Sequence, residues 1–331
     1  MSMPGQQEPQ AADSWEPRAG SKLAVVGAGS VGTSLAYAAL IRGSAHEVAL
    51  YDVNAAKAEA EVLDLAHGTQ FSASSGITGG GDITTMAGAD VVVITAGAKQ
   101  APGQTRLDLA GTNVRILEDL LPRLLEQAPD AVYVLVTNPC DVLTVAARRI
   151  SGLPASRVLS SGTVLDTSRL RWLLARRGGV STSSVHASII GEHGDTEFPV
   201  WSNASIGPVP IREWKVAGER VFTEDYLGSV ASEVTNAAYK VIAGKGATNY
   251  AIGLAGARIV EAMLRAENAV LPVSTMLQGE YGITDVALSA PSVVGARGVH
   301  SVVEMTLDEA ETEALHRSAG ALRESLAKLG I

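Results

Sequence analysis

The chain has 331 residues, of which 46% are hydrophobic and 18% charged, a composition typical of a soluble globular protein long enough for two domains. Its formal net charge of −9 argues against a nucleic-acid-binding surface, because such surfaces gather basic residues. The single cysteine, Cys140, excludes an internal disulfide and a cluster of thiolate metal ligands. No apolar stretch reaches the roughly 18–20 residues of a membrane span. We therefore expect a cytoplasmic protein with no membrane, nucleic-acid or metal partner.

Residues 1–20 lack a basic start followed by an apolar core, so we expect a polar, disordered tail and no secretory signal. Short apolar runs then alternate with helical patterns. The expected strands cover 22–29, 46–53, 89–97 and 130–138, and the expected helices cover 30–43, 55–68 and about 107–127. Strands that are apolar on both faces and separated by helices indicate a parallel sheet covered on both sides. This pattern predicts a doubly wound α/β (Rossmann) domain over 21–160.

The pattern changes after about residue 160. We expect a helix over 163–177, a strand pair near 185–210, helices over 224–243 and 247–267, an antiparallel meander over 271–299 and a closing helix over 307–329. The second domain, 161–331, is therefore predicted to be a mixed α+β unit.

A glycine-rich turn, GAGSVG over 27–32, directly follows the first strand and opens the first helix. Gly27 permits the tight turn, Gly29 allows the backbone to approach a pyrophosphate, and Gly32 allows the helix to pack close to the sheet. Asp52 ends the next strand, where its carboxylate would accept hydrogen bonds from ribose hydroxyls and repel a 2′-phosphate. This context favours binding of NAD over a purely structural turn with an incidental aspartate.

A second signal is IIGEHGDTEFP over 189–199, in which His193 follows an apolar strand between Gly191 and Gly194. Histidine is the natural proton donor and acceptor near neutral pH. The chain has six histidines, most of which should be solvated or core residues, so His193 alone is a weak candidate.

Residues that could act together with His193 occur in SSGTVLDTSRLR over 160–171, where Asp166 and Arg169 are three residues apart on one helical face. An aspartate can orient a histidine and stabilise its imidazolium, and an arginine can bind a carboxylate through two parallel hydrogen bonds. The alternative is a helix-surface ion pair between Asp166 and Arg169, which would contribute little.

From about residue 22 to its C-terminus the chain resembles the L-lactate/malate dehydrogenase family. The resemblance rests on ordered motifs: GAGSVG, LYDVN, ITAGAKQAPGQTRLDL, VTNPCDVLT, SSGTVLDTSRLR, GEHGDTEFPVWS and KGATNYAIG. It implies an NAD-binding domain followed by a substrate domain, with NAD as the cofactor. It also implies hydride transfer between NADH and a small 2-keto acid.

The resemblance implies a role for individual residues as well. His193 is similar to the acid–base histidine, Asp166 to its partner, Arg169 to the carboxylate clamp, Arg106 to the loop arginine that polarises the substrate carbonyl, and Asn138 to the amide that contacts substrate and nicotinamide. The residues that fall at the family's NAD site are Gly27, Gly29, Val31, Gly32, Asp52, Lys57, Gly97, Ala98, Val136, Asn138 and Ser161. Of these, Lys57 equally fits a solvated helix lysine.

Gln100 falls where the family faces the far side of the keto carbon, and malate dehydrogenases typically place an arginine there. A neutral amide would leave the second carboxylate of oxaloacetate buried without a cation, which costs about 3–5 kcal/mol. The methyl group of pyruvate needs no charge and fits beside Gln100 and, by the same resemblance, Thr248. We therefore expect pyruvate and lactate as substrates, at the end of glycolysis or fermentation.

Two alternatives remain open at this point. Lys99 is adjacent to Gln100 and pocket volume cannot be read from sequence, so malate or another L-2-hydroxy acid is the first alternative. The second is a non-catalytic dinucleotide-binding protein, which the joint presence of His193, Asp166, Arg106 and Arg169 disfavours.

Arg171 and His186 raise a further hypothesis. Without the family resemblance, the simpler interpretation is that Arg171 is a solvated arginine and His186 a core histidine. Both positions, however, match those with which bacterial members of the family bind fructose 1,6-bisphosphate across a twofold subunit interface. The resemblance thus implies an allosteric homo-oligomer, expected to be a homotetramer, with this bisphosphate as an effector.

Overall fold

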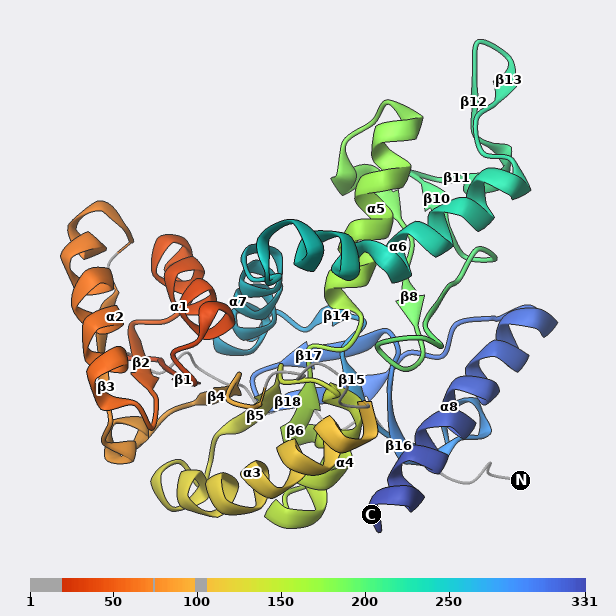
Figure 1. The fold of residues 1–331 in the computed structure, drawn as a ribbon. Helices are drawn as coiled ribbons and strands as arrows, with labels where there is room; N and C mark the ends of the chain where they lie inside the picture. The colour runs from red at the N-terminus through yellow and green to blue at the C-terminus, as the bar shows by residue number, and fades with distance from the viewer. Residues whose placement is uncertain (1–19, 74, 99–105) are drawn as a thin grey trace, which may run out of the picture.

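The computed structural model describes residues 20–73, 75–98 and 106–331, with only the backbone of Arg106 (Figure 1). Residues 1–19 of the expected tail, and Gln100, lie outside the described residues. The expected fold class is confirmed: a doubly wound parallel sheet is followed by a mixed α+β unit. Among the described residues, no helix is long and apolar enough to cross a membrane.

One eight-stranded sheet forms the centre of the molecule, in the order β16-β15-β6-β5-β4-β1-β2-β3. Its parallel strands are β1 (Lys22–Val26), β2 (Glu47–Tyr51), β3 (Gly76–Gly80), β4 (Val91–Ile94), β5 (Val132–Leu135) and β6 (Val158–Ser160). Two antiparallel strands from the second half, β15 (Ser274–Gln278) and β16 (Thr284–Ser289), extend the sheet beyond β6.

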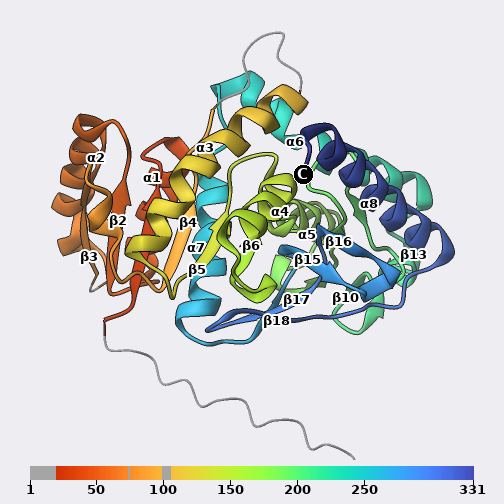
Figure 2. The same cartoon turned by 90° about the horizontal axis from the view of Figure 1, so that it is seen from below.

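Side-chain alternation along β1 divides the core into two layers. Leu23 and Val25 pack on the face covered by α1 (Ser30–Arg42), α2 (Ala55–Gly68) and α7 (Tyr250–Leu264). Ala24 and Val26 pack on the opposite face with α3 (Arg106–Gln127), α4 (Cys140–Ser151) and α8 (Glu309–Leu329). Figure 2 shows α1 and α2 at one end of the molecule and α8 at the other. All four residues are buried, as a parallel sheet with both faces covered requires.

A third core lies in the second half, where α5 (Val164–Gly178) and α6 (Glu224–Lys245) pack beside small antiparallel sheets. One sheet contains β7 (Val185–His186), β10 (Ser205–Ile206) and β11 (Val209–Pro210). Two hairpins pair β8 (Ile189–Ile190) with β9 (Phe198–Pro199), and β12 (Lys215–Val216) with β13 (Glu219–Arg220). The β8–β9 hairpin brings His193 toward the main sheet.

The expected single meander over 271–299 is divided between two sheets. β15 and β16 join the main sheet, whereas β14 (Ala269–Leu271), β17 (Ser292–Gly295) and β18 (Gly298–Val302) form a separate one. Pro291 lies between β16 and β17 and has no N–H to continue a ladder, so the chain changes direction there.

Candidate active site

The glycine-rich turn lies between β1 and α1, at the carboxyl edge of the parallel strands where dinucleotides bind in this architecture. Gly27 has a φ of +108°, which favours glycine. A Cβ on Gly32 would lie 1.9 Å from the carbonyl oxygen of Gly27, so only glycine allows α1 to begin so close to β1. A Cβ on Gly29, in contrast, would meet nothing within 4 Å. The turn is therefore closed on its sheet side and open at Gly29.

The residues of this turn fit a dinucleotide. Gly29 is the N-cap of α1 and supplies no side-chain cap, and the first turn of the helix carries no acidic residue. Its N–H groups and dipole are thus available to an anion such as a pyrophosphate. Asp52 accepts from the backbone N–H of Ala28 at 2.8 Å and of Asn54 at 2.9 Å. Its carboxylate keeps lone pairs for ribose hydroxyls.

The other expected NAD-site residues follow neighbouring strands. Gly97 and Ala98 come after β4, Val136 and Asn138 after β5, and Ser161 directly after β6. Val31 is half-buried in the first turn of α1. Lys57 is exposed on the first turn of α2, in a position that suits a solvated lysine.

Asn113 on α3 is a structural contributor that sequence reasoning missed. Its Oδ1 accepts from the backbone N–H of Ala98 at 2.7 Å, and its Nδ2 donates to the carbonyl of Asn138 at 2.8 Å. Asn113 is 2% exposed. One buried amide therefore ties the ends of β4 and β5 together beside residues expected at the nucleotide site. An asparagine within a helical pattern gives no sequence signal for such a role.

His193 lies in the loop that joins β8 to β9, and three other elements hold that loop. Its backbone N–H donates to Oδ2 of Asp141 on α4 at 2.7 Å. The N–H of Glu192 donates to Oγ of Ser318 on α8 at 2.6 Å. Gly191 pairs with Ser289 at the end of β16 through two backbone hydrogen bonds. The loop backbone is thus fixed by contacts that are distant in sequence.

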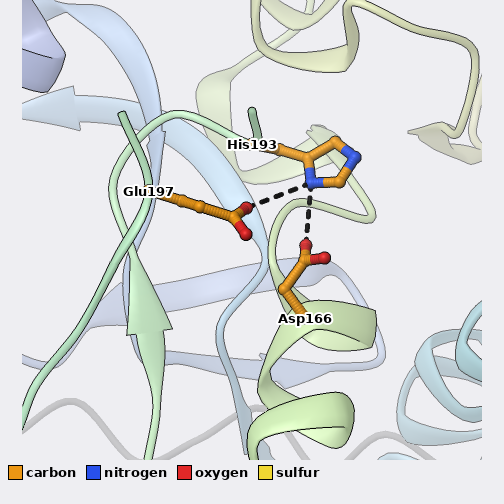
Figure 3. A group of neighbouring side chains, drawn as sticks. All are labelled: Asp166, His193 and Glu197. Atoms are coloured by element: carbon orange, nitrogen blue, oxygen red, sulfur yellow. Dashed lines mark hydrogen bonds and ion pairs between the residues drawn. The ribbon is translucent and has the colours of Figure 1, made fainter. Parts of the chain in front are cut away.

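The imidazole of His193 is held by Asp166, from the first turn of α5 (Figure 3). Oδ2 of Asp166 lies 2.8 Å from Nδ1 of His193, and Oδ1 accepts from the guanidinium of Arg169. The side chain of Asp166 is 2% exposed, against 18% for Arg169 and 25% for His193. The structure thus brings all three residues together. Asp166 and Arg169 do form an ion pair, but its carboxylate is buried and also contacts the histidine.

The electrostatics of this cluster favour a charged imidazole. Burial by itself would lower the pKa of His193, but the charge and hydrogen bond of Asp166, helped by Glu197, raise it well above its ordinary value. Burial alone would likewise raise the pKa of Asp166, but the charges of His193 and Arg169 hold it below the ordinary range. The pair therefore keeps a carboxylate against an imidazolium at neutral pH.

The position of Asp166 follows from how α5 docks on β8. The hydroxyl of Thr163 donates to the carbonyl of Ile189 at 2.6 Å, and the N–H of Ile189 donates to the hydroxyl of Thr167 at 2.9 Å. These bonds fix the first turn of the helix against the strand that leads into the His193 loop. A carboxylate in a first helical turn is also stabilised by the helix dipole.

Glu197 was not singled out by the sequence, yet it belongs to the same cluster (Figure 3). Its Oε2 lies 3.6 Å from Nδ1 of His193, and its side chain is 3% exposed. Burial raises the pKa of Glu197 to about 7. Asp166, His193 and Glu197 have ligand atoms within 4.8 Å of one another, a spacing that a metal ion tolerates. Since Asp166 is already bonded to His193 and Arg169, we interpret the group as a proton network.

The expected substrate residues are less completely placed. Gln100 and the side chain of Arg106 lie outside the described residues, and the backbone of Arg106 begins α3. Thr248 is half-buried in the connection between α6 and α7.

Arg171 on α5 contacts the backbone directly after β7, the strand that ends at His186. Arg171 is half-buried, and its Nε donates to the carbonyl of Ala187, the residue after His186, at 2.9 Å. Burial lowers the pKa of Arg171. His186 is exposed. His186 is therefore not the core histidine of the simpler interpretation, and Arg171 is only partly solvated.

Comparison with known proteins agrees with this geometry. Residues 21–160 match the NAD binding domain of the lactate/malate dehydrogenases, and residues 163–330 match their alpha/beta C-terminal domain. An L-lactate dehydrogenase of Bifidobacterium animalis subsp. lactis is 49% identical over 311 residues, which cover 94% of this chain and 97% of that protein. One from Synechococcus sp. is 48% identical over 92% of this chain and 97% of that protein.

A solved structure extends the likeness to three dimensions. The crystal structure of the minor L-lactate dehydrogenase from Enterococcus mundtii, in its ligands-bound form, superposes with a TM-score of 0.90 at 41% identity. The alignment covers 93% of this chain and 98% of that chain. The two domain matches together span nearly all of the described residues, so this chain belongs to the lactate/malate dehydrogenase family.

Proposed function

We propose that the chain is an NAD-dependent L-lactate dehydrogenase that interconverts pyruvate and (S)-lactate. The observation that carries this proposal is the buried contact of Asp166 with Nδ1 of His193, beside Arg169. It leaves Nε2 of the imidazole as the atom that can exchange a proton with substrate. The names of the relatives, L-lactate dehydrogenases, support the same reaction.

The proton moves through His193. In reduction, the protonated ring donates from Nε2 to the keto oxygen, and in oxidation the neutral ring accepts the hydroxyl proton there. When bound, NADH supplies the hydride that reduces the keto carbon. Asp166 keeps the ring oriented and stabilises its charged form, so the donor is already protonated when substrate arrives.

Arg169 is the residue we assign to the substrate carboxylate. Its Nη1 donates to Asp166, and the rest of its planar fork keeps donors for a second anion. Because Asp166 holds it next to His193, a bound carboxylate would place the neighbouring carbonyl near Nε2. Binding of the carboxylate would therefore orient the keto group toward the proton donor.

For the loop before α3, we propose that Arg106 polarises the substrate carbonyl and that Gln100, with Thr248, favours a methyl group over a second carboxylate. This selection would make pyruvate the preferred substrate over oxaloacetate. Donors that reach the oxygen only on loop closure would act mainly on the transition state.

The test is consumption of NADH by the purified protein with pyruvate or oxaloacetate, followed at about 340 nm, the general assay for this class of reaction. We expect pyruvate to be reduced with the higher kcat/KM. Faster reduction of oxaloacetate would favour a malate dehydrogenase. No turnover of either acid, with NADH still bound, would indicate a non-catalytic dinucleotide-binding protein.

We further propose that the protein works in the cytoplasm as a homotetramer, with residues 21–160 and 161–331 as its NAD-binding and substrate domains. Four large apolar side chains on the adjoining helices α1 and α7 support assembly, since they are between 52% and 71% exposed: Tyr37, Ile41, Tyr250 and Leu254. Such patches commonly mark subunit interfaces. Light scattering coupled to size exclusion would give the mass directly.

We also propose fructose 1,6-bisphosphate as an effector bound at Arg171 and His186. The support is their location in the fold: Arg171 donates to the carbonyl of Ala187, the residue after His186, and the ring of His186 is exposed. Two such pairs across a twofold axis would repel each other until phosphates neutralise them.

A further inference from the structure

A second carboxylate faces the same ring nitrogen that Asp166 contacts. Oε2 of Glu197 lies 3.6 Å from Nδ1 of His193 (Figure 3). The Glu197 side chain is 3% exposed, and its Oε2 has no hydrogen-bond partner among the described residues. Orienting the imidazole needs only one carboxylate, and Asp166 already fulfils that role. The burial of a second acid here, with an unsatisfied oxygen, calls for another explanation.

The charged groups around the imidazole show which cation can stabilise an ionised Glu197. Asp166 is balanced by Arg169 on its own helix, α5. Asp141 contacts the backbone N–H of His193 from α4, and burial raises the pKa of Asp141 to about 6. Cys140 on α4 contributes a buried, uncharged thiol, and the carboxylate of Glu192, in the His193 loop, accepts from Thr196. The imidazole lies 3.6 Å from Glu197, and the charge of Arg169 also favours the ionised form of Glu197.

Two buried groups in this relation titrate as a pair. An ionised Glu197 stabilises the imidazolium, and a protonated Glu197 does not. Burial raises the pKa of Glu197 to about 7, so its charge changes in the range where an enzyme operates. As the pH rises through this range, the carboxyl becomes negative and strengthens the hold of His193 on its own proton.

We propose that Glu197 is a positioning residue for charge: when ionised, it keeps His193 protonated at neutral and mildly alkaline pH and so favours binding and reduction of the 2-keto acid. This inference rests on the proposed function, in which reduction needs the protonated ring and oxidation needs the neutral one. Glu197 acts through His193 and touches no reacting atom.

The test compares wild type with Glu197→Gln, which keeps the size and polarity of the side chain but removes its charge. The alkaline limb of kcat/KM for pyruvate should move to lower pH by about one unit, roughly a tenfold loss at pH 8 relative to pH 6. The acidic limb of kcat/KM for lactate should also move to lower pH, so the efficiency of lactate oxidation near pH 7 should rise. A purely structural defect would lower both efficiencies and leave both limbs in place. That result would overturn the proposal.

Glu311→Gln is the matched control. Glu311 is also buried in the second half of the chain, where it accepts from the backbone N–H of Ser202. Its replacement should leave both limbs of the pH profiles where they are in wild type. If Glu197→Gln fails to fold, Glu197→Asp keeps the charge but withdraws it from Nδ1, so we expect a smaller shift of the same sign. Unmoved limbs in that variant would again contradict the proposal.

A second readout does not need turnover. Titration of ¹⁵N-labelled histidine by NMR should show the pKa of His193 lowered in Glu197→Gln relative to wild type. If wild type fails to reduce pyruvate but the shift occurs, the proposed function fails while the coupling holds. If wild type is active and the pKa of His193 does not change, only the present inference fails.

Discussion

The carboxylate of Asp166 lies 2.8 Å from Nδ1 of His193 and at the same time binds Arg169, so one buried negative charge organises both of these cations. This arrangement couples the two tasks of the site. The group that orients the proton donor also positions the guanidinium that we assign to the substrate carboxylate. A change at Asp166 should therefore affect catalysis and substrate binding together.

The first prediction concerns Asp166→Asn. Loss of the charge should lower the pKa of His193, because that charge is what opposes burial in raising it. Since reduction needs the protonated ring, the loss in kcat/KM for pyruvate should be greater at pH 8 than at pH 6. We expect roughly 10²–10⁴-fold overall, measured from pH-dependent initial rates. Asp119→Asn, an exposed change on α3, is the control. An equal loss at both pH values would argue against the assigned role.

The second prediction separates chemistry from cofactor binding. His193→Asn should abolish turnover, while NADH still binds, because the expected nucleotide site lies at the ends of β1, β2, β4, β5 and β6 and the His193 loop does not belong to it. Quenching of protein fluorescence by NADH, measured beside the rate assay, checks both parts. Near-normal turnover after purification from host enzymes would contradict the proposed mechanism.

The third prediction uses two glycines of one turn. Gly32→Ala places a Cβ 1.9 Å from the carbonyl oxygen of Gly27 and should destabilise the protein by about 1–3 kcal/mol or more. Gly29→Ala meets no atom within 4 Å, so its stability should be close to that of wild type, but the added methyl should weaken NADH binding. Urea unfolding and NADH titration distinguish the two. Unchanged NADH affinity in a stable Gly29→Ala protein would show that no phosphate approaches this residue.

Sequence patterns predicted most of the long helices and four of the six parallel strands, β1, β2, β4 and β5, because their apolar content is high. They missed β3, whose sequence GITGG has three glycines and little apolar content, and β6, which is three residues long. The helix α4 was also missed, although it supplies Asp141 to the His193 loop. These elements are specified by tertiary contacts more than by local preference.

The residues of the candidate site likewise include some that the sequence indicated and some that it did not. Asp166, Arg169 and His193 were found because their motifs resemble those of a known family. Glu197 and Asn113 were missed, because a glutamate in a polar loop and an asparagine in a helix are ordinary in sequence. What makes them unusual is burial beside Nδ1 of His193 in one case, and bonds to two strand ends in the other. Neither contact can be read from spacing along the chain.

The fourth prediction tests substrate choice. Gln100→Arg should raise kcat/KM for oxaloacetate and lower it for pyruvate, because an arginine would pair with the second carboxylate of oxaloacetate and would be left unpaired beside a methyl group. Losing one partner of a buried pair costs about 3–5 kcal/mol, so the ratio of the two efficiencies should change by at least a hundredfold. The two substrates are compared at equal NADH. A ratio that barely moves would mean that Gln100 does not face the substrate.

The fifth prediction concerns the effector. If fructose 1,6-bisphosphate binds Arg171 and His186 across a subunit interface, it stabilises the assembled form, and by linkage it should lower the pyruvate concentration needed for half-saturation. Histidine is charged in acid, so the effect should be stronger at pH 6 than at pH 8. Arg171→Gln should weaken the effect of the bisphosphate at both pH values, because the guanidinium supplies the bidentate partner of a phosphate.

The decisive measurement for this effector is pyruvate saturation at both pH values, with and without millimolar bisphosphate, on wild type and on Arg171→Gln. Arg177→Gln is a suitable control, because Arg177 lies further along α5, where its guanidinium packs over the ring of Tyr226. That variant should respond as wild type does. Half-saturation that is unchanged in wild type under all four conditions would leave the half-buried Arg171 with a structural role only, its hydrogen bond from α5 to Ala187. His186 would then be an ordinary exposed histidine.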